Sequence, residues 1–256
     1  MKRSIIKGGL FIRGIILPVL LAAFSLCTPP GISSAQDKAP DPLAVLQGME
    51  AAYAKVDNYT ATFIKRELVN GELLPEETVS LKFKKPFKVY MKWVKEPHKN
   101  REAMYVRGMY DNKVVGHEGG LISFVTLHMA PTGSTAMKGN RHPITDVGIG
   151  RLMEIVSTNV RRAVSAGELT LSSKGEEELY GRKVRRYDAE LPREKDKGYY
   201  ARRIRLWVDA GLGLPIRIEV YGWNEELLES YGYRDLKINP GLTDAEFDEK
   251  YKGYDF

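Results

Sequence analysis

Residues 203–220 read Arg-Ile-Arg-Leu-Trp-Val-Asp-Ala-Gly-Leu-Gly-Leu-Pro-Ile-Arg-Ile-Glu-Val, and this stretch decides the fold. Apolar residues alternate with charged residues on both sides of a central segment that contains two glycines. Such alternation is typical of strands with one buried face, and glycines between two of them indicate a turn. The stretch therefore predicts two antiparallel strands that are apolar on one face and charged on the other.

Most of the remaining chain repeats this pattern. Residues 59–69 are rich in strand-forming residues and end at Asn70-Gly71, a pair that favours a tight hairpin turn. The alternation returns in residues 79–93, with an interruption at Pro86. Further strands are expected at 102–107, 113–117, 184–191 and 228–238.

Two helices are expected among these strands. Asp41 followed by Pro42 is a strong start signal, and apolar residues at helical spacing predict a helix over 42–56. A second helix is expected over 146–163, capped by Thr145. Because no parallel strand–helix–strand rhythm occurs, the pattern predicts a mainly β (α+β) fold, an antiparallel sheet with two covering helices.

The first 35 residues are predicted to be a secretory signal peptide. Four basic residues precede an apolar stretch, and Ser33-Ser34-Ala35 provides a small-residue cleavage site. We expect cleavage after Ala35, periplasmic localisation, and one domain over residues 36–256. Two alternatives stay open: a retained membrane anchor, although the apolar stretch, residues 14–26, is shorter than the roughly 20 residues of a membrane span, and a lipoprotein signal at Cys27, although Leu26 precedes it.

Removal of this segment changes the charge and the chemistry of the chain. The net charge falls from +6 to +2, because four of the 39 basic residues and no acidic residue lie in it. The chain then gives little reason to expect nucleic-acid binding. Cys27 is the only cysteine, so the mature chain has neither a disulfide nor a thiolate metal site.

The sequence contains no recognisable catalytic motif. It has no Gly-x-Ser-x-Gly elbow, no His-Glu-x-x-His motif and no phosphate-binding Gly-Lys-Ser/Thr loop. His117-Glu118 is the only pair that suggests metal ligands, and we expect neither a metal nor a cofactor there. An unrecognised hydrolase would need histidines and carboxylates that come together only in the fold.

The apolar positions of the strands provide a better candidate site. By alternation they share one face of the sheet, which is either an ordinary core or the wall of a cavity for a ligand. The candidate cavity residues are Phe63, Leu81, Phe83, Val89, Met91, Trp93, Leu206, Ile216 and Ile218.

Several segments resemble known families. Residues 208–219 and 231–242 are similar to turn segments of the periplasmic lipoprotein carrier and outer-membrane lipoprotein receptor superfamily. Residues 59–63, 85–93 and 139–145 resemble an exported bacterial family of unknown function, domain-of-unknown-function family 1571. The resemblance implies a strongly curved, open antiparallel sheet, a half-barrel, with about two helices over its concave face.

The same resemblance implies a non-enzymatic carrier of a lipid or acylated lipoprotein ligand, without catalytic residues and without a membrane span after cleavage. Arg66 and Arg141 are the candidates for the carriers' cavity arginine. The segment 119–145 departs from the carriers, and its Asn140, Arg141, His142 and Pro143 are candidates for a lid or for the site of an envelope protein partner. In the second case the protein would be an interaction or sensing module. Alternatively, Pro143 and Thr145 simply start the second helix.

Overall fold

The computed structural model of the protein describes residues 39–120 and 125–256. The prediction of a signal peptide over residues 1–35 lies outside the described residues.

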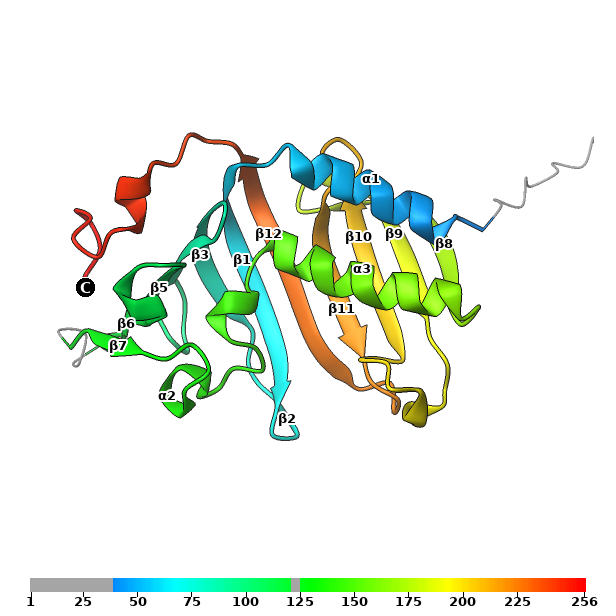
Figure 1. Ribbon diagram of the computed structural model, residues 1–256, viewed down its shortest axis with the longest axis horizontal. Coiled ribbons are helices and arrows are strands. Elements are labelled where there is room, and N and C mark those ends of the chain that lie inside the picture. Colours follow the sequence, from blue (N-terminus) through cyan, green and yellow to red (C-terminus); the bar gives the residue numbers. More distant parts are fainter. Residues whose placement is uncertain (1–38, 121–124) are drawn as a thin grey trace, which may run out of the picture. The chain divides into compact units, whose positions relative to one another are not determined.

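One antiparallel sheet of twelve strands dominates the described residues (Figure 1). Its strands are β1 (Asn58–Val69), β2 (Glu72–Leu73), β3 (Glu77–Lys84), β4 (Lys88–Trp93), β5 (Glu102–Val106), β6 (Val114–His117), β7 (Leu127–Met129), β8 (Thr170–Leu179), β9 (Arg182–Glu190), β10 (Arg203–Asp209), β11 (Pro215–Tyr221) and β12 (Leu227–Ile238). Their spatial order is β7-β6-β5-β4-β3-β1-β12-β11-β10-β9-β8, and β2 pairs only with β1. Apart from the short β2, strands that are consecutive in the chain pair within β1–β7 and within β8–β12, and these two meanders meet where β1 pairs with β12.

Two long helices cover one face of this sheet. Figure 1 shows α1 (Pro42–Ala54) and α3 (Ile149–Ser165) lying side by side across β8 to β12. The ion pair between Arg161 of α3 and Glu50 of α1, 2.9 Å long, joins them. Within the described residues the edge strands β7 and β8 do not pair, so the sheet is open. The predicted fold class, a curved open antiparallel sheet with about two helices on its concave face, is confirmed.

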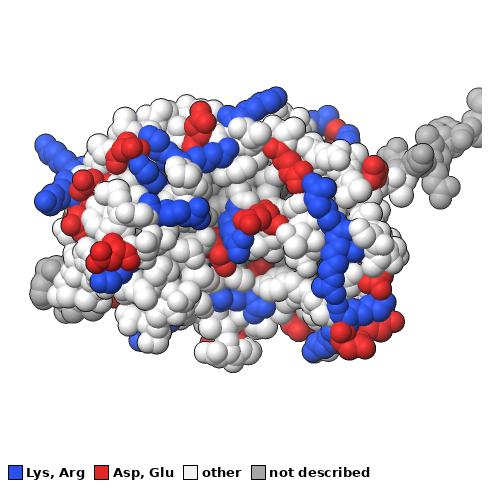
Figure 2. Space-filling model, viewed as in Figure 1, with Lys and Arg blue, Asp and Glu red and all other residues white. Residues whose placement is uncertain are grey.

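Short elements occupy the connections. They are α2 (Ser134–Met137) and the 3-10 turns η1 (Tyr110–Asn112), η3 (Ile144–Asp146), η4 (Lys195–Lys197) and η5 (Asp244–Phe247). Basic and acidic side chains lie next to each other on the face shown in Figure 2.

The helix starts differ in how well the sequence predicts them. The Asp41 side chain accepts a hydrogen bond of 3.0 Å from the Leu43 N–H, so the predicted start of α1 is confirmed. The predicted Thr145 cap is wrong, because Thr145 lies in η3 and α3 begins after Gly148. Gly148 has a φ of +116°, and a Cβ there would lie 3.0 Å from Tyr59. Tertiary packing, and not a local cap, therefore sets this helix start.

Tyr59 connects β1 to the start of α3. Its side chain is fully buried and stacks on Phe83 with ring centroids 5.1 Å apart. The Ile149 N–H, one of the helix-end donors without a partner inside the helix, donates to the Tyr59 hydroxyl at 3.0 Å. The apolar cluster around this contact includes Leu46 of α1 and Ile216 of β11. The central strand and both helices therefore share one core.

The expectation of a sheet that is charged on its whole outer face is wrong over β4 to β6. There the outward side chains of Tyr90, Met104 and Val115 pack under the C-terminal segment, which contributes Leu242 and Phe247. A capping box at Thr243 and Glu246 starts η5 within that segment. Both faces of the sheet are thus buried in this region.

We predict that Tyr59→Phe lowers the free energy of unfolding by about 1–3 kcal/mol, because the buried Ile149 N–H loses its acceptor. Chemical denaturation monitored by circular dichroism measures this change. Tyr251→Phe is the matched control, since no hydrogen bond to its hydroxyl is found among the described residues, and we expect a change within about 0.5 kcal/mol. Equal losses in both variants would contradict this role of Tyr59.

Candidate functional site

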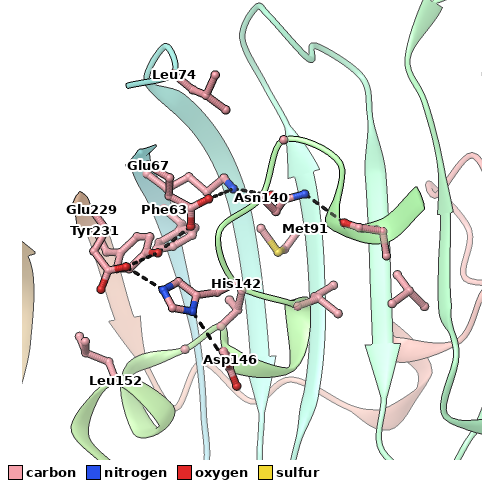
Figure 3. Close-up of a pocket in the computed structure, with 18 of the residues that line it drawn as sticks. Phe63, Glu67, Leu74, Met91, Asn140, His142, Asp146, Leu152, Glu229 and Tyr231 are labelled. Atoms are coloured by element: carbon pink, nitrogen blue, oxygen red, sulfur yellow. Dashed lines mark hydrogen bonds and ion pairs between the residues drawn. The ribbon is translucent and has the colours of Figure 1, made fainter. Parts of the chain in front are cut away.

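A cavity of about 870 Å³ lies between the inner face of the sheet, α3 and the segment 130–148. We call this segment, which contains α2 and η3, the lid. The cavity wall is largely apolar, with Phe63 from β1, Met91 from β4, Ile218 from β11, and Leu152 and Val156 from α3. Figure 3 shows the labelled wall residues Phe63, Met91 and Leu152 together with the lid residues that face them. Cavities of this size and lining are typical of sites for small organic ligands.

The nine predicted cavity residues divide into three groups. Phe63, Met91, Trp93 and Ile218 line the cavity. Leu206 lines a separate, smaller void. Leu81, Phe83, Val89 and Ile216 line neither of these two spaces and lie in the core. The alternation identifies the inward face of each strand, but it does not say which inward positions the helices cover.

One end of the cavity is charged, and sequence reasoning missed it. Lys65, Glu67 and Glu77 are buried on the inner face, where the Lys65 ammonium lies 3.2 Å from Glu67 and 3.7 Å from Glu77. The Trp93 indole N–H donates to Glu77. A signal was available, because Lys65 and Glu67 follow Phe63 at intervals of two and so point to the same face. A buried carboxylate without a partner is costly, and here each has one.

The lid is attached to this charged end (Figure 3). The Asn140 side-chain oxygen accepts a 2.6 Å hydrogen bond from Lys65, and the Arg141 backbone N–H donates to Glu67 at 2.9 Å. The His142 ring donates through Nε2 to Glu229 of β12 at 2.7 Å. Three consecutive lid residues thus contact buried charged groups of β1 and β12.

The candidate residues of the lid have different positions. Asn140 and His142 line the cavity, whereas Arg141 and Pro143 do not. The Arg141 guanidinium lies 3.4 Å from Glu229 and donates to the Tyr200 hydroxyl at 3.0 Å. Pro143 precedes η3, so the alternative that it starts the second helix is wrong.

Of the remaining sequence candidates, His117 and Glu118 line the cavity and Arg66 does not. Arg66 lies on the outer face of β1, because its neighbours Lys65 and Glu67 lie on the inner face. Its Nε donates to the Leu74 carbonyl. The His117 ring meets Phe256 edge to face, with ring centroids 5.7 Å apart, whereas Glu118 forms an ion pair with Arg101. Among the described residues no group of three or more His, Cys, Asp or Glu side chains is arranged to hold a metal ion.

The charges of the lid contacts shift the pKa values of their groups. Burial opposes ionisation of Glu67, but the charge of Lys65 and the hydrogen bonds from Arg141 and Tyr231 outweigh it and lower the pKa of Glu67. Burial also opposes protonation of His142. The hydrogen bond to Glu229, together with the negative charges of Glu229, Glu67 and Asp146, outweighs that effect and raises the pKa of His142.

This cluster contains a histidine and several carboxylates, as a hydrolase would require. Glu229, however, accepts hydrogen bonds from both His142 and the Tyr200 hydroxyl, and Tyr231 donates to Glu67 at 2.6 Å. The His142 contact joins the lid to β12, the Tyr231 contact joins β12 to β1, and Tyr200 belongs to the connection before β10. The hydrogen bonds of His142 and Glu229 therefore attach the lid to the sheet.

Comparison with known families agrees with the sequence motifs. Residues 56–256 match the family described as "Protein of unknown function (DUF1571)".

The chain belongs to the DUF1571 family.

This confirms the family suggested by the sequence. A comparison of the DUF1571 protein with curated proteins finds none that matches.

Solved structures with a similar arrangement include MucB, with a TM-score of 0.47 and 14% identity over 81% of this chain and 62% of MucB. The Mycobacterium tuberculosis lipoprotein LppX has a TM-score of 0.47 and 12% identity, over 81% of this chain and 98% of LppX. A LolA superfamily protein from Nitrosomonas europaea has a TM-score of 0.34 and 10% identity, over 83% of this chain and all of the other. The match spans less than two thirds of MucB. Similarities at this level carry no argument about function, which must come from the site.

The raised pKa of His142 predicts a pH-dependent stability of the DUF1571 protein. The charged ring stabilises the fold fully below its ordinary pKa of about 6.5, and the contribution is lost as pH rises through the higher folded value. We therefore expect the destabilisation caused by His142→Gln to be largest in mild acid and to shrink above neutrality. Denaturation curves at a series of pH values measure this difference.

His98→Gln is the control, because the pH dependence of its effect on stability should run in the opposite direction. Burial and the charge of Arg101 lower the pKa of His98, so its contribution to stability is lost as pH falls. If the effect of His142→Gln is the same at every pH, the His142–Glu229 contact is not the charged pair described here.

Proposed function

We propose that the protein is an exported, non-enzymatic binding or carrier protein of the periplasm, and that it holds an acyl chain of a lipid or acylated protein in its cavity. The observation that carries the proposal is a cavity of about 870 Å³ with an apolar wall and a charged end. No helix of the described residues is long and apolar enough to cross a membrane. The periplasmic location rests on the predicted signal peptide.

The two parts of the cavity suit the two parts of an amphiphile. Against Phe63, Met91 and Ile218, each buried methylene of a bound chain contributes about 0.8 kcal/mol. Lys65 and Glu67 also line the cavity as a paired charged group, a lining that suits the polar end of an amphiphile better than its chain. A water-soluble ligand would gain little from the apolar wall.

The alternative is a module that binds or senses an envelope protein through residues 119–145. The contacts of the lid argue against it, because the polar groups of Asn140, Arg141 and His142 are bonded to residues of the same chain. The same contacts support a lid that separates a bound chain from water. A partner retained in a pull-down and lost in an Arg141→Ala, His142→Ala variant would favour the alternative.

Mass spectrometry of solvent extracts tests the proposal. The full chain is expressed, and the exported protein is purified without detergent. Its solvent extract is compared with that of a blank purification. We expect a lipid or acyl compound in a stoichiometric amount. An empty extract from folded protein would contradict the proposal.

We predict that Ala103→Trp abolishes this co-purification without unfolding the protein. Ala103 is a partly buried residue of β5 that lines the cavity beside Met91, its partner on β4, so an indole there occupies ligand space. Ala103→Ser is the matched control and should retain the ligand. Equal lipid content in both folded variants would place the ligand elsewhere.

A further inference from the structure

A second, smaller void lies beneath the two long helices. Its volume is about 40 Å³, and it is bounded by α1, α3 and the strands β8 to β10. Its wall consists of side chains such as Val156 and Val160 of α3, Ala189 of β9, and Ile204 and Leu206 of β10. A space of this size can hold a water molecule, but a water needs polar partners, and these side chains are almost wholly apolar. The void is suited to carbon atoms.

The small void and the large cavity share two wall residues, Val156 of α3 and Ile204 of β10. Both side chains are only partly buried, which fits residues that face open space. Val156 approaches from the helix side and Ile204 from the sheet side. Together they form the partition between the two spaces.

Apolar side chains on α3 and on the inner face of the sheet run from one space to the other, past Val156 and Ile204. On α3, Leu152, Val156 and Val160 are spaced four residues apart and so lie along one face of the helix. Leu152 lines the large cavity, Val156 lines both spaces, and Val160 lines the small void. The helix thus provides a continuous apolar track from one space to the other.

The sheet provides the matching track. Val220 of β11 lines the large cavity and pairs with Ile204 of β10, which pairs with Ala189 of β9. Ala189 lines the small void. A chain that ran beneath α3 across these three strands would meet apolar side chains at every step, and only the partition would stop it.

We propose that Val156 and Ile204 set the length of the acyl chain that the protein accepts. This inference rests on the proposed function. A chain in the large cavity ends against the partition, and further methylenes remain outside the apolar wall. Removal of the partition joins the two spaces and lets a longer chain continue beneath the helices.

The test uses lysophosphatidylcholines with saturated chains from octanoyl to stearoyl, which compete with a bound fluorescent naphthylamine dye. For the unaltered protein we expect the affinity to rise with chain length and then level off. In Ile204→Ala the rise should continue for one or two more methylenes, at about fourfold per methylene. Val156→Ala should act in the same direction and serves as a second variant should Ile204→Ala not fold.

Leu206→Ala is the matched control, because Leu206 lines the small void but not the large cavity. The Leu206→Ala change enlarges the void and leaves the partition in place. The chain length at which the affinity stops rising should therefore stay the same. Thermal unfolding shows whether each variant is folded. If the folded partition variants level off at the same chain length as the unaltered protein, the partition proposal is overturned while acyl binding stands. If no chain length displaces the dye from the unaltered protein, both proposals are overturned.

Discussion

The site depends on the hydrogen bonds that the buried carboxylate of Glu67 accepts. This carboxylate accepts hydrogen bonds from Lys65 on its own strand, from Tyr231 on β12 and from the backbone of Arg141 in the lid. A buried charge costs several kcal/mol unless its partners are held in place, so these contacts form together or not at all. They fix the charged end of the cavity and the closed position of the lid at the same time. An open sheet cannot cover its own inner face, and the lid with the two helices provides that cover.

Much of the fold follows from local patterns in the sequence. The alternation in residues 203–220 becomes β10 and β11, and Asn70-Gly71 forms the expected hairpin turn, with positive φ at both residues. Asp41 and Pro42 start α1 as expected. These features depend on residues close together in the chain, and for that reason the sequence alone predicts them.

The remaining features depend on residues far apart. The start of α3 is set by Tyr59, 90 positions away, and the covering of Tyr90 depends on the C-terminal segment. In the sequence Lys65 and Glu67 resemble ordinary strand charges, because their lid partners, Asn140 and the Arg141 backbone, lie 75 and 74 positions away. Pattern therefore identified the inward face of the sheet, but it did not separate Phe63, which lines the cavity, from Phe83, which the core covers.

A crystal structure of the protein isolated without detergent would show whether an acyl chain occupies the space between the sheet, α3 and the lid. We expect continuous, unbranched electron density along Phe63, Met91 and Ile218, with the polar end of the ligand near Lys65 and Glu67. A cavity that contains only ordered water, or density for a peptide bound at the lid, would contradict acyl binding in this cavity.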